Sequence, residues 1–212
     1  MKKIMFNDKY SLTQAVLDGR KTMTRRIIKC PRTFKGEWVA GFNIHRRHSD
    51  KKIVGYPCMY DADERKFDSG EIIPRYKVGE VLSIAQSYLD LSLAEVSQWK
   101  SNGNKTTINS LAGWTNKLFV KAELMPHHIR ITNIKIERLQ DISDEDCLKE
   151  GIYKGQCGSE DTHFMDAYYY KGDILPYCTP REAFAALIDK VSGKGTWESN
   201  PYVFVYEFEL ID

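Results

Sequence analysis

The chain of 212 residues is long enough to bury a hydrophobic core, and its apolar content of 42% is typical of globular proteins. No run approaches the roughly 20 consecutive apolar residues that a membrane helix requires, and Asp8 interrupts the start before a signal-type segment develops. The five cysteines are widely spaced and include no Cys-x-x-Cys pair, which is typical of a reducing compartment. We therefore expect a cytoplasmic protein with reduced thiols and no membrane partner.

The small net charge of +2 conceals a strong asymmetry along the chain. Residues 1–58 carry 14 Lys/Arg and 4 Asp/Glu, a local net charge of +10, whereas residues 59–212 carry 17 Lys/Arg and 25 Asp/Glu, a net charge of −8. A basic segment folded onto one surface focuses a positive field that attracts phosphate. The alternative is that the two halves neutralise each other across the surface.

The N-terminal third predicts one helix followed by basic, irregular sequence. Residues 12–19 place apolar side chains at helical spacing, with a serine as the cap and Gly19 as the stop. Residues 20–29 mix Thr and Ile with basic residues, which is typical of an exposed loop that enters a strand. Residues 31–58 show neither period and are expected to form an irregular insertion, and residues 57–67 predict a strand, a polar turn and a strand.

The middle of the chain predicts two buried strands. A turn at Gly79 leads into an apolar strand at residues 81–84. Residues 128–139 predict a long strand because their β-branched residues nearly alternate and no helix cap precedes them. Between the two strands we expect a helix at 89–98, a loop at 100–117 and a strand at 118–122.

The C-terminal third combines two helices with a closing strand. Residues 141–151 predict a helix because Ser143 caps it and acidic residues fill its first turn. Residues 153–180 contain Gly, paired Tyr and two prolines and are expected to form a second irregular insertion. A capped helix at 180–191 and an apolar strand at 201–210 follow. Short strands among isolated helices indicate an α+β or small-barrel fold, not a doubly wound sheet.

The most distinctive local pattern is Gly19-Arg20-Lys21-Thr22-Met23-Thr24-Arg25-Arg26, directly after the first predicted helix. A lysine three residues before a threonine can set an amine near a hydroxyl, and that hydroxyl becomes a nucleophile only when a base removes its proton. Lys21 can serve as this base if desolvation or its cationic neighbours lower its pKa. The alternative is a basic turn that contacts phosphate, with Thr24 an ordinary strand residue.

The pattern Gly19-x-Lys21-x-x-Thr24-x-Arg26 resembles the Gly-x-Lys-x-x-[Thr/Glu]-x-Arg signature of the ASCH domain, a group within the PUA-like superfamily. Three further blocks resemble this family in the expected order: a turn and strand at 76–82, a strand and acidic helix at 129–150, and a closing strand at 200–210. The resemblance implies a PUA-like mixed β-barrel with peripheral helices. It also implies one domain over residues 1–212, with insertions at about 31–73, 89–117 and 153–199 as in long, phage-associated relatives.

Two functions follow from this resemblance, neither of which requires a cofactor. One is binding of RNA, of another nucleic acid or of a modified nucleoside. Its positive surface is formed by Arg20, Lys21, Arg25, Arg26, Arg46 and Arg47, and Gly19 is expected among the binding residues. The other is the activity of the family's bacterial N(4)-acetylcytidine amidohydrolases, whose lysine, threonine and glutamate fall on Lys21, Thr24 and Glu150. In that reaction Thr24 attacks or positions water, Lys21 acts as a base or stabilises charge, and Glu150 orients them or exchanges protons with them.

Two positions carry further expectations. Many longer relatives have a glutamate after the Gly79-type turn where this chain has Gln86, which keeps the shape of the side chain and loses its charge; we expect Gln86 among the substrate-binding residues. For Glu150 the alternative is an ordinary solvated carboxylate near a helix end.

Metal-ligand and base-stacking side chains also occur in the basic region. Cys30, His45, His48 and Cys58 have ligand-type side chains, but their spacing matches no standard zinc pattern, so we expect no metal. Trp38 and Phe42 lie among basic residues and can stack on bases; the alternative is that they belong to the core.

Overall fold

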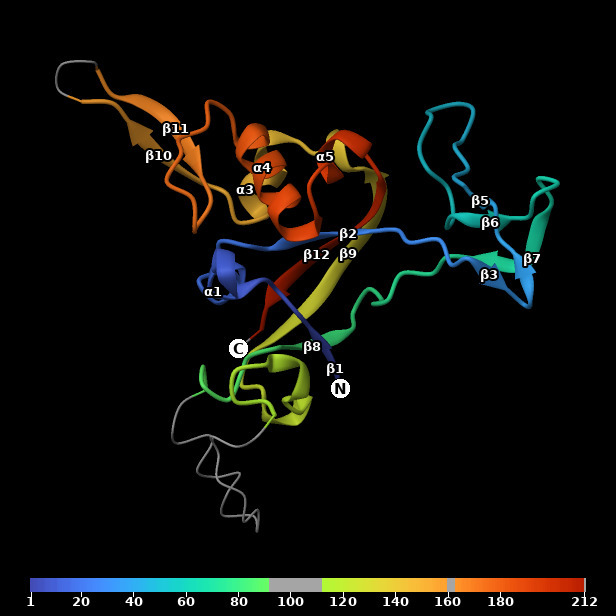
Figure 1. Cartoon of the computed structure of the whole chain (residues 1–212), viewed down its shortest axis with the longest axis horizontal. Coiled ribbons are helices and arrows are strands. Elements are labelled where there is room, and N and C mark those ends of the chain that lie inside the picture. The colour runs from blue at the N-terminus through green and yellow to red at the C-terminus, as the bar shows by residue number, and fades with distance from the viewer. Residues whose placement is uncertain (92–111, 160–162, 212) are drawn as a thin grey trace, which may run out of the picture.

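The computed structural model describes residues 1–91, 112–159 and 163–211. These residues form an α+β fold around a five-stranded sheet with the strand order β1-β8-β9-β12-β2 (Figure 1). Its strands are β1 (Lys2–Ile4), β2 (Met23–Ile27), β8 (Val81–Ile84), β9 (His128–Arg138) and β12 (Tyr202–Leu210). β1 runs parallel to β8, and the other neighbours in the sheet are antiparallel.

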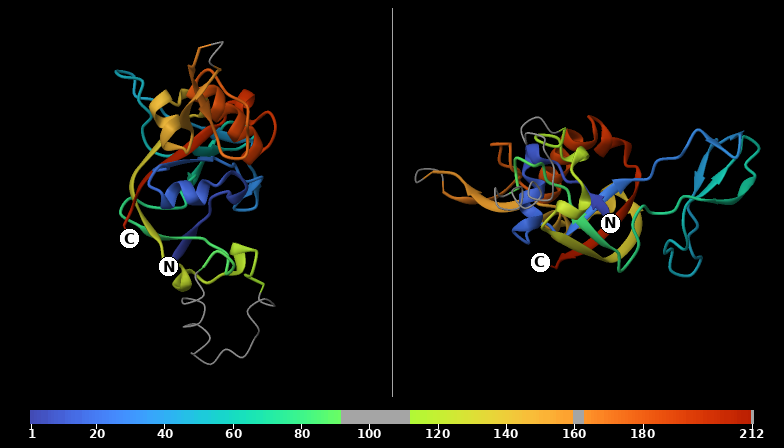
Figure 2. Two further views of the ribbon diagram at one scale, coloured as in Figure 1. Left: turned by 90° about the vertical axis from the view of Figure 1, so that its left-hand side faces the viewer. Right: turned by 90° about the horizontal axis from the view of Figure 1, so that it is seen from below.

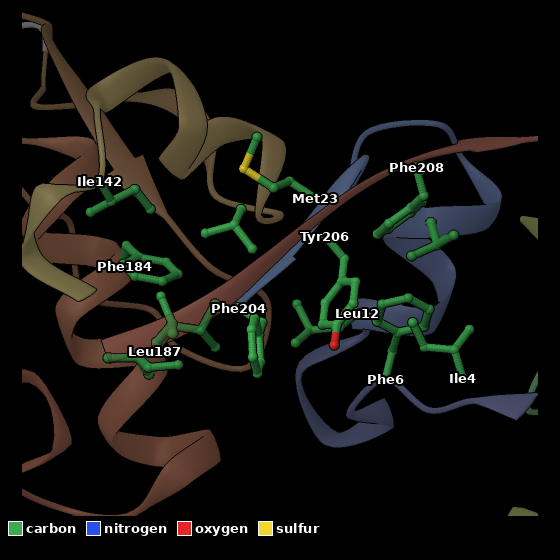
Figure 3. Packing of buried hydrophobic residues seen from close by; sticks show 14 of the residues in the cluster. Ile4, Phe6, Leu12, Met23, Ile142, Phe184, Leu187, Phe204, Tyr206 and Phe208 are labelled. Atoms are coloured by element: carbon green, nitrogen blue, oxygen red, sulfur yellow. The ribbon is translucent and has the colours of Figure 1, made fainter. Parts of the chain in front are cut away.

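The expected closed barrel is not formed by the described part of the chain. β1 and β2 are the two edges of the sheet, and no strand pairing joins them within the described ranges. The space beside them is filled by side chains: Phe6 packs against Phe208 with ring centroids 5.7 Å apart, and Leu12 and Tyr206 lie next to them (Figure 3). A side chain also links the two edges, because the Arg26 guanidinium donates to the Met5 carbonyl oxygen at 2.5 Å.

The long central strands follow the sequence pattern. β9 and β12 pair from Arg138 opposite Tyr202 to Ile129 opposite Leu210, with one irregularity near Glu207. Their β-branched and aromatic residues suit a pleated, half-buried surface. The strands expected at 81–84, 128–139 and 201–210 are thus confirmed.

The helices pack beside β2 and β12. They are α1 (Leu12–Leu17), α3 (Asp144–Lys149), α4 (Pro180–Ser192) and α5 (Thr196–Ser199). Phe184 and Leu187 of α4 lie next to Phe204 of β12 (Figure 3). The predicted caps of α3 and α4 are confirmed, since the Ser143 hydroxyl accepts from the Asp146 N–H and the Thr179 hydroxyl accepts from the Glu182 N–H, both at 3.1 Å. No helix in the described ranges is long and apolar enough to cross a membrane.

The start of α1 differs from the expectation. A short 3₁₀ helix, η1 (Asp8–Tyr10), precedes α1, and Ser11 ends η1 in the left-handed region with φ 50°. Its backbone N–H bonds the Asp8 carbonyl at 2.9 Å. Gly19, with φ +70°, follows α1 as expected.

Two β units extend from the sheet at opposite ends of the molecule (Figures 1 and 2). The first, here called the arm, is residues 29–73; it contains the pair β3 (Thr33–Phe34) and β4 (Glu37–Trp38), and a three-stranded sheet of β5 (Gly41–Asn43), β6 (Cys58–Tyr60) and β7 (Lys66–Glu71). The strand, turn and strand expected at 57–67 are confirmed as β6 and β7. The rest of the arm is less irregular than expected.

The second unit corrects the expectation of an irregular insertion at 153–180. β10 (Tyr153–Cys157) and β11 (Met165–Tyr169) form an antiparallel hairpin in that segment. Tyr153 stacks on Tyr169 across the pair with ring centroids 5.7 Å apart, and such cross-strand aromatic pairs stabilise hairpins.

The segment before β9 is helical, so the strand expected at 118–122 is wrong. Two 3₁₀ helices occupy it, η3 (Lys117–Phe119) and η4 (Ala122–Leu124), and a third, η5 (Leu139–Asp141), follows β9. The Asn116 side chain caps η3 by accepting from the Leu118 N–H at 3.0 Å. Most of the helix expected at 89–98 and of the loop expected at 100–117 lies outside the described residues.

Candidate functional site

Lys21 lies in the turn between α1 and β2, and its side chain points into the protein. The Lys21 N–H bonds the Ala15 carbonyl at 2.8 Å and the Thr22 N–H bonds the Lys149 carbonyl at 3.0 Å, so the turn is fixed to the ends of two helices. The Lys21 ammonium donates to Glu150 Oε2 at 2.5 Å and to the Glu150 carbonyl oxygen at 2.8 Å. The two side chains are 2% and 6% exposed, so the expectation of an exposed basic turn is wrong at Lys21.

The glycine that follows Glu150 packs closely against α1. Gly151 has φ +105°, a conformation that favours glycine. A Cβ atom at this position would lie 3.2 Å from Leu12 Cδ2 and 3.7 Å from Lys21 Cδ. The first distance is tighter than an ordinary van der Waals contact and the second is ordinary, so the glycine that stops α3 also permits its close packing on Leu12 of α1.

Arg25 is a second buried cation on the same carboxylate. Its Nη1 lies 3.1 Å from Glu150 Oε1, and its Nη2 lies 2.7 Å from Glu137 Oε1 and 3.0 Å from Asp146 Oδ2. A guanidinium has five N–H donors in one plane and can serve several carboxylates at once. Because the Arg25 side chain is only 1% exposed, the expectation that it belongs to an exposed positive surface is wrong.

These residues form one charge-balanced network, here called the ionic cluster: Lys21, Arg25, Lys135, Glu137, Asp146 and Glu150. Lys135 completes it at 3.3 Å from Glu137 and 3.2 Å from Asp146. Removing a member without its partner would leave a buried charge uncompensated. The cluster thereby ties the start of β2 to β9 and to α3.

The environment acts differently on the two buried cations. Burial lowers the pKa of Lys21 below its usual range, and the nearby Arg26 and Arg25 act in the same direction, while Glu150 opposes them. Burial also opposes the charge of Arg25, but Glu150 and Glu137 outweigh it and raise the Arg25 pKa. Arg25 therefore stays charged, and Lys21 is the cation that gives up a proton more easily.

A cleft of about 1080 Å³ opens beside β2, and Lys21, Thr24 and Glu150 all line it. Thr24 lies opposite Tyr206 in the sheet and is buried. Its hydroxyl makes no hydrogen bond to another described residue, so it is available to a ligand. The fold thus brings the three residues of the expected Lys, Thr and Glu set to one concave surface.

The lining of this cleft is strongly basic. Seven lining residues are cationic and one is a carboxylate, Glu150; the cations are Lys2, Lys3, Lys21, Arg25, Arg26, Lys29 and Arg75. Arg26, Lys29 and Arg75 are exposed, and no carboxylate of the described ranges forms an ion pair with them. Their charge is therefore directed to solvent at the cleft.

Other predicted residues lie elsewhere. Arg20 is exposed outside the cleft and pairs with Asp18 at 2.8 Å. Arg46 and Arg47 are exposed on the arm. Gln86 does not line the cleft; it is buried after β8, with its backbone N–H 3.2 Å from Met125 Sδ, and its Oε1 atom accepts no hydrogen bond from any residue that the structure describes.

Some residues of the site were not predicted. Arg75 and Tyr76 follow the arm and line the cleft, and Glu137 and Asp146 hold Arg25. Asp146 belongs to the acidic first turn of α3, whose charges favour the helix dipole and here also pair with Arg25.

No metal site forms among the described residues. No group of three or more His, Cys, Asp or Glu side chains in these ranges is arranged to hold an ion. His45, one of the ligand-type residues of the arm, lies with Nε2 2.8 Å from Lys66 Nζ.

Comparison with known proteins returns no match: no protein-family model, no curated protein and no solved structure matches this chain. The cleft and the ionic cluster are therefore the basis for a functional assignment.

Proposed function

We propose that the cleft beside β2 binds a nucleotide, free or within a nucleic acid, and that the chain is an ASCH-type member of the PUA-like superfamily. The observation that carries the proposal is the free positive charge of the cleft: Arg26, Lys29 and Arg75 are exposed in its lining and form no ion pair with a described carboxylate. A concave surface with charge of one sign focuses its field and raises the local concentration of phosphate. The four sequence blocks that resemble the ASCH domain support the family.

The cleft also offers apolar surface for a planar base. Five aromatic rings from four segments line it, each at most 5% exposed: Phe6, Tyr76, Phe184, Phe204 and Tyr206. Ile73 and Leu118 line it too, and both are exposed. Bases of nucleic acids are bound by stacking and apolar contact, with phosphate held by nearby cations. A ligand with an anionic group and a flat body matches this combination better than a simple anion does.

Calorimetric titration with cytidine and cytidine 5′-monophosphate tests the proposal. We expect tighter binding of the monophosphate, and we expect Arg26→Ala and Arg75→Ala to weaken that binding while cytidine binding changes little. Arg65→Ala is the matched control, because Arg65 is an exposed arginine of the arm outside the cleft. If both cleft variants bind the monophosphate as the parent does, the cleft is not the binding site. Thermal unfolding of each variant checks the fold, since Arg26 also contacts Met5.

A second candidate function is hydrolysis of an N-acylated cytidine. The observation that favours it is the lowered pKa of buried Lys21 beside Glu150, on a cleft that also holds the Thr24 hydroxyl. Neutral Lys21 would take a proton from Thr24, or from a water that Thr24 positions, while the oxygen attacks the acyl carbon. The acyl carbon–nitrogen bond then breaks and the proton passes to the departing amine, with Glu150 exchanging protons with Lys21. Where Thr24 itself attacks, a water then attacks the acyl-threonine ester, the acyl carbon–oxygen bond to Thr24 breaks, and the carboxylic acid leaves while Thr24 regains its proton.

Incubation with N(4)-acetylcytidine, followed by chromatography of the released cytidine, tests this activity. We expect release by the parent and by Thr22→Ala, and none by Thr24→Ala. Thr22 is a suitable control because it neighbours Thr24 in sequence and does not line the cleft. Equal release by Thr24→Ala and the parent would exclude a role for this hydroxyl. No release by a parent that binds the compound would leave nucleotide binding as the function.

A further inference from the structure

A second cleft, of about 1070 Å³, lies between the arm and β9. Arm residues from Arg46 to Tyr56 form one wall, and Ile134 to Glu137 of β9 form the other. Residues 73–78, which connect the arm to the sheet, complete the lining. The arm, whose structure the sequence predicted only in part, therefore contributes about half of the residues that line the second cleft.

This second cleft carries available positive charge. Five of its lining residues are cations and three are carboxylates. Asp50 is paired with Arg47, and Glu137 belongs to the ionic cluster. By contrast, Lys51, Lys52 and Lys77 are exposed and form no ion pair within the described ranges.

The two clefts are adjacent. Ile73 and Tyr76 line both of them, and Ile73 is 64% exposed. Arg75 lines the first cleft and Lys77 lines the second, so one short segment places a cation in each. Exposed Tyr56 adds an aromatic ring to the second cleft.

We propose that the second cleft binds the phosphodiester backbone of a single nucleic-acid strand whose target nucleotide occupies the first cleft; this inference rests on the proposed function. Lys51, Lys52 and Lys77 contact phosphates, and Tyr56 and Ile73 contact bases next to the target. A nucleotide must leave the base stack before it can enter a concave pocket, and this costs least in a strand that is already single. The ligand is thus a polymer that spans both clefts, not an isolated nucleoside.

Binding of fluorescent oligocytidylates of increasing length, as RNA and as DNA, tests this inference against cytidine 5′-monophosphate. We expect affinity to rise at least tenfold from the monophosphate to the octanucleotide. The triple variant Lys51→Ala/Lys52→Ala/Lys77→Ala is expected to lose most of this gain and to bind the monophosphate as the parent does. Each phosphate contact on a single strand adds about 0.7 to the slope of log affinity against log salt, so three lost contacts reduce the slope by about 2.

The control is Lys121→Ala/Lys154→Ala/Lys171→Ala, which removes the same charge from exposed positions outside both clefts. If the two triple variants bind the octanucleotide equally, or if the octanucleotide binds no more tightly than the monophosphate, the second cleft does not bind the strand and only the nucleotide pocket stands. Equal binding of an octamer duplex overturns the single-strand inference. If neither the monophosphate nor the octanucleotide binds, the proposed function itself fails.

Discussion

Replacing Glu150 with Gln tests the ionic cluster directly. The substitution keeps the shape of the side chain and removes the carboxylate that lies 2.5 Å from Lys21 Nζ. Arg25 keeps Glu137 and Asp146, whereas Lys21 keeps the backbone carbonyl of residue 150. Removing one partner of a buried ion pair costs about 3–5 kcal/mol. We expect a loss of unfolding free energy near the lower end of that range at pH 7, because Arg25 keeps two of its three carboxylates and only Lys21 is left without one.

The loss should shrink as the pH rises. Burial already holds the pKa of Lys21 below the ordinary 10.5, and without Glu150 the interaction that opposes this shift is gone, so the folded-state pKa falls further. At pH values between the folded-state and the unfolded-state pKa of Lys21, the unfolded chain binds more protons than the folded chain does. The stability of the variant therefore rises with pH through this window.

Urea unfolding at pH 7 and pH 9 measures both effects. Glu145→Gln is the matched control, since this carboxylate is on the same helix, is 77% exposed and pairs with Lys149 at the surface; its loss should stay below about 1 kcal/mol. The double variant Lys21→Met/Glu150→Gln should regain much of the loss, because both members of the buried pair are then neutral. A loss no larger than that of the control, or one that grows from pH 7 to pH 9, would refute this account.

Three further predictions concern residues around the site. Cys147 is fully buried, and burial raises the pKa of its thiol to about 12. Alkylation at pH 8 should therefore modify exposed Cys178 and should modify Cys147 only after unfolding, which peptide mass spectrometry measures. Burial opposes the charge of Asp146, but Lys135 and Arg25 hold its pKa below 3.8, so its contribution to stability is present above that pH and lost as the pH falls through the folded-state pKa. Asp146→Asn should therefore lower stability by about 2 kcal/mol at pH 7 and flatten the fall in stability below pH 4 in acid titrations. Gln86→Met removes a buried amide oxygen without a partner and should raise the unfolding free energy by about 1 kcal/mol in urea melts.

The elements that could be predicted from sequence are those whose signals are local. The caps of α3 and α4, at Ser143 and Thr179, lie within three residues of the N–H groups they satisfy. β9 and β12 could be predicted because they are rich in β-branched and aromatic residues. The β10–β11 hairpin was missed because glycine and lysine in Tyr153–Cys157 hide the alternation of its first strand. The segment at 117–124 resembles a strand in composition. Its position also depends on a residue far away in the sequence, because the Lys117 ammonium donates to Asp8 Oδ1 at 2.7 Å.

The residues of the candidate site also divide into those with a local sequence signal and those without one. The pattern from Gly19 to Arg26 singled out Lys21 and Thr24, but only the family resemblance connected them with Glu150, 129 residues further along the chain from Lys21. The burial of Arg25 had no local signal, because its three carboxylate partners come from β9, from α3 and from the residue that ends α3. An arginine in an edge strand is ordinarily solvated, and the distant partners reverse that preference here.

The residues just before and just after the arm are both hydrogen-bonded to β12. The Ile28 N–H bonds the Tyr202 carbonyl at 2.9 Å, and the Arg75 N–H bonds the Tyr206 hydroxyl at 3.1 Å. Because β12 holds both ends of the arm, the residues of the arm can change in number and sequence without shifting the register of the central sheet. The arm is consequently a place where evolution, or a protein engineer, can exchange whole hairpins and so change the wall of the second cleft, while the buried charges around Glu150 remain in place.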